Sequence, residues 1–402
     1  MSDSWGRFTE RGSEAVEDRI RAIMVEAQGA FASTCGDQAR AVVLLGGYGR
    51  GEGGVERRDD GDVPHNNFDF LAILEGGDTT AIKRRIDRAL APLVDQHGIG
   101  MDVGVVSTAE LARAPSLVMW YDMRHGHKTI LGDGDYVPSL DHFRLNRIPA
   151  WDVRNLLVNR GSLLLINDLI LDRGQLDESD RRTIIKHAVK AVIGCGDAWL
   201  FFDGKYDWSY VEKQKRMAGA GAPERLRTLY DEAMEFRFEP NYGKHLDRDL
   251  LAWNDELRGL FSEVHLLCER KRLERPELRW DQYAQVAFSR ALTDDALRPR
   301  TLAKKGVALL RPKGGFGGLG VRGQLGFWAS RPRERLPVLF PAVTYDRMPR
   351  NLIDLARSAL SAAGDRPRDL RRAYLRAWGE HGDTNFHAVL RKLRIDLEGR
   401  PR

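Results

Sequence analysis

The first hundred residues alternate between amphipathic stretches and short apolar runs. Residues 14–33 place apolar side chains at helical spacing, which predicts a helix with one buried face. Residues 41–45 form a continuous aliphatic run that ends at a pair of glycines, as expected for a buried strand that enters a turn. Residues 68–74 and 101–106 have the same character. Three strands are therefore predicted behind an N-terminal helix.

Two further helices are predicted on either side of the third strand. Residues 79–97 have Thr79 or Thr80 as an N-cap and contain Pro92, which predicts a helix that bends or restarts at the proline. After the third strand, a capping-box pattern begins at Ser107 and starts another helix. The predicted order is helix, strand, loop, strand, helix, strand, helix.

Beyond residue 150 strand patterns nearly vanish and long helical patterns take their place, at residues 156–171, 184–202, 223–237 and 247–270. Residues 311–327 contain seven glycines and precede a proline-rich stretch that reaches residue 341, which predicts a loop or hinge. Residues 348–398 are again helical in pattern and rich in arginine. These patterns predict an α+β chain in three parts: a sheet-containing domain at 1–145, a helical domain at 146–300, and a hinge with a C-terminal helical region at 301–402.

Composition narrows the class of protein. Hydrophobic residues make up 42% and charged residues 30% of the 402 residues, as in soluble folded proteins. There is no N-terminal secretory pattern, and no apolar run approaches the ~20 residues needed to cross a bilayer, so we expect a cytoplasmic protein without membrane contact. The three cysteines lie far apart, without the spacing of a zinc site, and are predicted to be buried thiols. A net charge of +5 permits an anionic partner.

A glycine-rich turn follows the first strand. Residues 46–52 read Gly-Gly-Tyr-Gly-Arg-Gly-Glu, and such a turn lets backbone N–H groups approach a phosphate. It matches neither the dinucleotide-binding pattern nor the P-loop pattern. By itself the turn is also compatible with a purely structural role.

Oxygen-bearing side chains follow on the next two strands. Asn67 and Asp69 point to the same face of a strand because side chains alternate. Asp102 lies on the third strand among residues that favour burial, so its carboxylate needs a partner such as a metal ion or an arginine. Magnesium fits this set, because it prefers carboxylates together with phosphate oxygens.

Together, the turn at 46–52, the strand with Asn67 and Asp69, and the later strand with Asp102 resemble the DNA polymerase beta-type nucleotidyltransferase superfamily. Residues 120–133 are similar to the segment that often closes such domains, and the resemblance covers about residues 40–135. It implies a nucleotidyltransferase-type mixed sheet. The implied reaction transfers a nucleoside monophosphate from a nucleoside triphosphate such as ATP to an acceptor hydroxyl, with Mg²⁺ or Mn²⁺ as the cofactor.

The resemblance also implies roles for individual residues. The amides of Gly46 and Gly47, with Arg50 and Glu52 of the same turn, would bind the nucleotide. The catalytic and metal-binding residues would be Asn67, Asp69 and Asp102. Asp102 would complete the metal site or take the proton of the acceptor hydroxyl.

The sequence departs from the family pattern in two places. Residues 56–62 form an apparent insertion whose Asp59, Asp60 and Asp62 either substitute for a missing ligand or form a solvated acidic loop. Asn67 stands where the resemblance expects an aspartate, and it offers a carbonyl oxygen without negative charge. Three alternatives would explain this asparagine: a changed metal requirement, a natural loss of catalysis, or a substitution that was introduced.

Basic residues of the helical half are candidates for phosphate contacts. Lys186 and Lys190 form a cationic edge of the nucleotide cleft or an exposed face of a core helix, and Tyr206 extends that edge or packs in the interior. Lys205, Tyr210, Lys213 and Lys215 are further members of that possible edge. Arginines in the C-terminal part would suit RNA phosphates, although acidic residues are interleaved with them.

Three functions remain open at this point. The first is an active nucleotidyltransferase whose acceptor is a small molecule, a protein or an RNA end, with a small molecule as the preferred acceptor. The second is a nucleotide-binding or regulatory module without catalysis. The third is an RNA-binding protein. The oligomeric state does not follow from the sequence.

Overall fold

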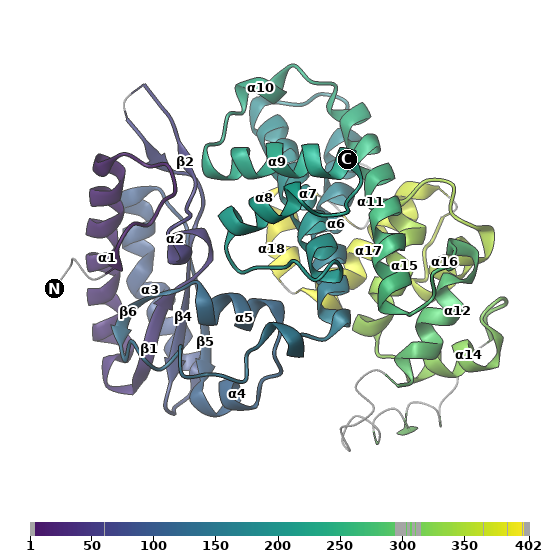
Figure 1. Cartoon of the computed structure of the whole chain (residues 1–402), viewed down its shortest axis with the longest axis horizontal. Helices are drawn as coiled ribbons and strands as arrows, with labels where there is room; N and C mark the ends of the chain where they lie inside the picture. The colour runs from purple at the N-terminus through teal and green to yellow at the C-terminus, as the bar shows by residue number, and fades with distance from the viewer. Residues whose placement is uncertain are drawn as a thin grey trace. The chain divides into compact units, whose positions relative to one another are not determined.

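In the computed structural model, the described residues are 5–59, 61–293, 303, 306–307, 310, 315–364, 366–383, 385–395 and 397. The described part is an α+β structure, with an N-terminal helix and a mixed four-stranded sheet followed by a largely helical region (Figure 1). This confirms the predicted fold class. Asp60 and the first residues of the predicted hinge, 311–314, lie outside the described residues.

The chain forms two compact units, each made of two stretches of sequence. The first unit comprises Met1–Val153 and Asp203–Gly243, and the second comprises Arg154–Phe202 and Lys244–Arg402. The predicted division at residues 145 and 300 is therefore not the division that the contacts define. Residues 203–243, which we call the return segment, belong with the sheet although they follow two long helices in sequence.

The sheet of the first unit has the strand order β5-β4-β1-β6. The strands are β1 (Ala39–Leu44), β4 (Phe68–Leu74), β5 (Met101–Ser107) and β6 (Lys128–Gly132). β4 and β5 are parallel, whereas β1 is antiparallel to both β4 and β6. The three predicted strands are present, and β6 is a fourth strand at the edge.

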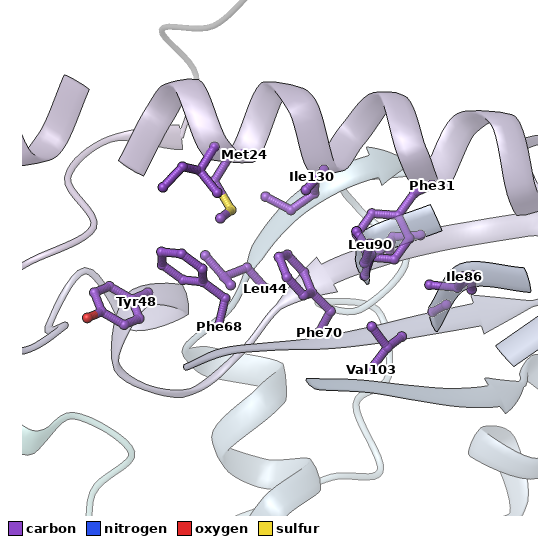
Figure 2. Close-up of a cluster of buried hydrophobic side chains, with 14 of the residues drawn as sticks. Met24, Phe31, Leu44, Tyr48, Phe68, Phe70, Ile86, Leu90, Val103 and Ile130 are labelled. Carbon is purple, nitrogen blue, oxygen red and sulfur yellow. The ribbon is translucent and has the colours of Figure 1, made fainter. Parts of the chain in front are cut away.

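Helices cover both faces of this sheet. α1 (Glu14–Cys35) and α3 (Thr79–His97) bury one face, where Phe31 of α1 contacts Phe70 of β4 edge to face with ring centroids 5.1 Å apart. Figure 2 shows this core, with the α1 side chains pointing toward the sheet. α4 (Thr108–Arg113) and α5 (Val118–His125) contribute to a second apolar cluster on the opposite face.

The helix boundaries correct two details of the prediction, the cap of α3 and its restart at Pro92, and confirm a third. Asp78, rather than Thr79 or Thr80, caps α3, because its Oδ1 accepts from the amides of Thr80 and Ala81 at 2.9 and 3.1 Å. α3 runs through Pro92 without interruption. The capping box at Ser107 is present.

The remaining elements of the first unit are short or belong to the return segment. They are α2 (Gly46–Arg50), β2 (Val55–Glu56), β3 (Val63–Pro64), α8 (Tyr210–Ala218), α9 (Glu224–Phe238) and the 3-10 turns Gly36–Gln38 and Leu145–Arg147. β2 and β3 pair with each other as a separate two-stranded ribbon.

The second unit is helical. Its described helices are α6 (Ala150–Leu171, which begins in the first unit), α7 (Glu178–Phe202), α10 (Gly243–Leu246), α11 (Leu250–Arg272), α12 (Trp280–Ala291), α14 (Gly320–Ala329), α15 (Pro332–Thr344), α16 (Arg350–Ala359), α17 (Pro367–Ala377), the π turn η4 (Trp378–Gly382) and α18 (Asn385–Lys392). No helix in the described part of the chain is long and apolar enough to span a membrane.

The predicted loop or hinge is present at residues 315–319, which are turns and irregular chain, but it is wrong for most of 320–341, where α14 and α15 form. The glycines of α14 allow close contact with α12, because a Cβ on Gly326 would lie 1.8 Å from the carbonyl oxygen of Phe288. α15 starts with Pro332 at its first turn, where a missing N–H has no cost, and buries its residues 336–344. Burial of these apolar side chains offsets the hydrogen bonds that Pro337 and Pro341 remove.

Candidate active site

Asn67, Asp69 and Asp102 lie together at one end of the parallel strand pair. Asp69 of β4 is in register with Asp102 of β5, and neighbouring strands are about 4.8 Å apart. The side-chain amide Nδ2 of Asn67 donates to Oδ2 of Asp102 at 3.0 Å. All three residues are exposed, although the rest of β4 is buried. The sheet therefore presents two carboxylates and one amide to solvent at a single point.

The glycine turn lies directly beside this cluster. The backbone amide of Leu45 donates to the carbonyl of Asp69 at 2.7 Å, which joins the end of β1 to β4. Gly46 has φ +65°, and a Cβ at this position would lie 3.0 Å from Oδ2 of Asp69. Glycine is thus required at position 46 for its backbone conformation and for the space taken by the carboxylate.

The donor set fits one hard divalent cation. Two exposed carboxylates from adjacent strands and an amide oxygen are ligands that Mg²⁺ accepts, with phosphate oxygens completing the shell. Among the described residues, no group of three or more His, Cys, Asp or Glu side chains could hold a metal. An aspartate in place of Asn67 would add a third carboxylate, so this asparagine leaves the set one charge short of a two-metal site.

Arg50 has a partner within the protein. Its guanidinium is only 6% exposed and forms an ion pair with Asp122, with Nη2 and Oδ2 2.6 Å apart. Its Cζ lies 4.5 Å from the ring centroid of Tyr210, and these neighbours raise its pKa above the ordinary value against the lowering effect of burial. The predicted contact of Arg50 with a nucleotide stays a prediction, while the observed contacts join the turn to α5 and α8.

Glu52 and Tyr206 are also joined to the return segment. The buried carboxylate of Glu52 accepts from the hydroxyl of Ser209, the N-cap of α8, and from the amide of Tyr210, the latter at 2.7 Å, so it is bonded to the start of α8. The buried Tyr206 donates its hydroxyl to Asp122 at 3.0 Å. Packing, one of the two alternatives for Tyr206, is what the structure describes.

The lysines of the predicted cationic edge are distributed over both units. Lys213 is buried, with Nζ 4.5 Å from the ring centroid of Tyr210, whereas Lys205 donates to the carbonyl of Gly219 at 2.7 Å. Lys215 is an exposed residue that pairs with Glu212. Lys186 and Lys190 lie on α7 of the second unit and are half-buried, and their contact with a nucleotide stays a prediction.

The acidic insertion offers little to the site. Asp59 is exposed, which agrees with a solvated loop. Asp62 is largely covered and forms an ion pair with Arg57 at 2.5 Å, and it also accepts from the amide of Ser13 at 3.3 Å. The Arg57 and Ser13 contacts lower the pKa of Asp62, although burial acts against them.

Arg237, near the end of α9, was not singled out by the sequence patterns. A Cβ on Gly47 would lie 2.8 Å from its Nη2, so the guanidinium packs directly on the glycine turn. Its Cζ lies 4.0 Å from the ring centroid of Tyr210. The sequence carries no signal for this position, because an arginine at the end of an amphipathic helix is ordinary.

Comparison with known proteins leaves the family open. No protein-family model matches the chain, and no curated protein matches it in sequence.

Proposed function

We propose that the first unit is a nucleotidyltransferase domain that uses a Mg²⁺-bound nucleoside triphosphate and transfers the nucleoside monophosphate to an acceptor hydroxyl. One observation carries the proposal: the parallel pairing of β4 and β5 sets Asp69 beside Asp102 in front of Gly46, with Asn67 bonded to Asp102. A pair of exposed carboxylates beside a glycine turn suits a metal-bound polyphosphate.

The residues divide the work in the proposed reaction. Asp69 and Asp102 would hold the metal ion, which when bound neutralises phosphate charge and lowers the pKa of the acceptor hydroxyl. The amides of Gly46 and Gly47 begin a short helix and lack carbonyl partners within it, so they can donate to phosphate oxygens. The acceptor oxygen bonds to the α-phosphorus, the bond from this phosphorus to the bridging oxygen breaks, and pyrophosphate leaves. In this proposal, Asp102 would also take the acceptor proton.

The bond between Asn67 and Asp102 favours a second candidate function. The amide nitrogen of Asn67 occupies one lone pair of the Asp102 carboxylate, and among the residues that the structure describes two carboxylates lie at this point, with no group of three that could hold a metal. A module that binds a nucleotide but transfers it slowly or not at all would have this composition. The two candidates differ in turnover and share the ligand.

Pyrophosphate release separates these candidates. The wild-type protein is incubated with each α-labelled nucleoside triphosphate and MgCl₂ in the presence of a panel of aminoglycoside, nucleoside, peptide and RNA acceptors, and both pyrophosphate and labelled product are measured. Transfer that is lost in Asp69→Asn supports the enzyme, and binding without transfer supports the second candidate. The control is Asp59→Asn, which removes an exposed carboxylate outside the site.

Restoration of the missing carboxylate completes the experiment. If residue 67 is a metal position, Asn67→Asp supplies a third carboxylate and should raise the rate of transfer at least tenfold. A tenfold increase corresponds to about 1.4 kcal/mol of transition-state stabilisation. Absence of nucleotide binding in the wild type and in Asn67→Asp would contradict both candidates.

A further inference from the structure

The return segment brings an unusual concentration of cations to the glycine turn. The ring of Tyr210 has three cations within 4.5 Å of its centroid: Arg237 at 4.0 Å, and Arg50 and Lys213 at 4.5 Å. Tyr210 itself is held by the bond from its amide to Glu52. The cations therefore converge on one fixed aromatic ring next to residues 46–52.

The nearby carboxylates already have partners. Asp122 pairs with Arg50 and accepts from Tyr206, and Glu52 accepts from Ser209 and from the amide of Tyr210. Within the described residues, no carboxylate forms an ion pair with Arg237, and its buried Nε has no hydrogen-bond partner. A guanidinium in this environment is costly without a counter-charge, so an anion bound at this place would be stabilised.

Two glycines fix the position of Arg237. A Cβ on Gly54 would lie 2.3 Å from the Arg237 carbonyl oxygen, so only glycine lets this part of α9 approach so closely. At Gly47, a Cβ would lie 2.8 Å from the guanidinium nitrogen. The backbone and the end of the side chain are therefore both seated against the turn, and the stacked Tyr210 ring limits the rotation of the guanidinium plane.

We infer that Arg237 binds the terminal phosphates of the nucleoside triphosphate; this inference rests on the proposed function, which supplies the ligand. Gly46 faces the Asp69 carboxylate and Gly47 faces the guanidinium, so a phosphate chain along the turn meets metal ligands at one residue and a cation at the next. Arg50 then serves to anchor the turn, since its charge is paired with Asp122. The site selects ligands that carry a polyphosphate tail.

The test separates polyphosphate binding from metal binding. Binding of inorganic tripolyphosphate is measured by calorimetry in EDTA, and binding of Mn²⁺ alone by paramagnetic resonance, for wild type, Arg237→Gln, Arg237→Lys and Asp69→Asn. We expect Arg237→Gln to weaken tripolyphosphate binding at least tenfold and leave Mn²⁺ binding within twofold. Asp69→Asn should weaken Mn²⁺ binding at least tenfold and leave tripolyphosphate binding within twofold. The control Arg225→Gln removes an exposed charge from the same helix and should change neither.

Each result leads to a decision. If Arg237→Gln does not fold, the inference is tested with Arg237→Lys, which keeps the charge but lacks the planar guanidinium. A threefold or greater loss of tripolyphosphate affinity in Arg237→Lys then supports the inference. If the wild type binds ATP or transfers its nucleotide and both Arg237 variants retain wild-type affinity for ATP and tripolyphosphate, the inference is wrong and the proposed function stands. If tripolyphosphate binding depends on Arg237 but no nucleotide is bound or transferred, the anion site stands and the proposed function is wrong.

Discussion

Asn67→Asp should exchange stability for metal affinity. In the wild type, the amide of Asn67 donates to Asp102 over 3.0 Å. The substitution replaces this donor with a second carboxylate at the same place, so a hydrogen bond to a charged group is lost and a like-charge pair is created. We therefore expect the metal-free variant to be less stable than the wild type.

The magnitude follows from the geometry and the exposure. Two like charges about 4 Å apart repel by about 1 kcal/mol in a water-like environment, which is appropriate because residues 67, 69 and 102 are exposed. Loss of the hydrogen bond adds about 1 kcal/mol. A total of about 2 kcal/mol corresponds to a decrease in Tm of roughly 4–8 °C for a unit of about 200 residues.

Divalent cations should reverse this loss. Three carboxylates bind Mg²⁺ more tightly than two, and a ligand at 100 times its Kd stabilises the folded state by about 2.7 kcal/mol. Thermal unfolding is measured for wild type, Asn67→Asp and Asn67→Ala in EDTA and in increasing MgCl₂. Asn67→Ala is the matched control, because it removes the hydrogen bond without adding charge. An equal response of Asn67→Asp and Asn67→Ala to Mg²⁺ would refute the placement of residue 67 at the metal position.

Three further predictions concern stability. Gly326→Ala forces a Cβ to 1.8 Å from a backbone oxygen and should lower the free energy of unfolding in urea by about 3 kcal/mol. The control Gly259→Ala on α11 has open space around the new Cβ and should be neutral or stabilising. Equal effects of the two variants would contradict the packing of α14 on α12. Burial lowers the pKa of His187 to about 3 and of His265 to about 4, so below pH 6.5 the unfolded chain takes up protons that the folded chain does not. The unfolding free energy should therefore fall by about 3 kcal/mol between pH 6.5 and 5, and a urea series in which His187→Asn keeps the full pH slope would refute this account. Glu52→Ala removes the acceptor of the Ser209 hydroxyl and of the Tyr210 amide at the start of α8, so it should cost about 2 kcal/mol and expose the return segment to limited proteolysis. An unchanged digestion pattern would argue against that anchoring role.

Local patterning was sufficient for the helices and strands that surround the site. β4 and β5 are apolar runs interrupted by a single aspartate, and strand alternation places that aspartate on the face opposite Phe68 and Phe70. The glycines at 46 and 47 could be identified as a turn because they end such a run. These features depend on neighbours in sequence, so they can be read without the fold.

The prolines and glycines of the C-terminal part gave the wrong prediction for a physical reason. Propensity disfavours helix at Pro337, Pro341 and Gly326, yet α14 and α15 form because tertiary burial outweighs the local cost. The glycines serve contact between helices rather than flexibility, and this depends on which helix lies opposite.

Only the folded chain decided which residues meet at the glycine turn. The register of β4 against β5 pairs Asp69 with Asp102 and gives Asn67 its bond, and no local pattern sets that alignment. The return segment is separated from the turn by about 150 residues of chain, so the contacts of Arg237 arise from long-range packing alone. Residue type thus determined the available carboxylates, amides and cations, while topology determined which of them are paired with one another.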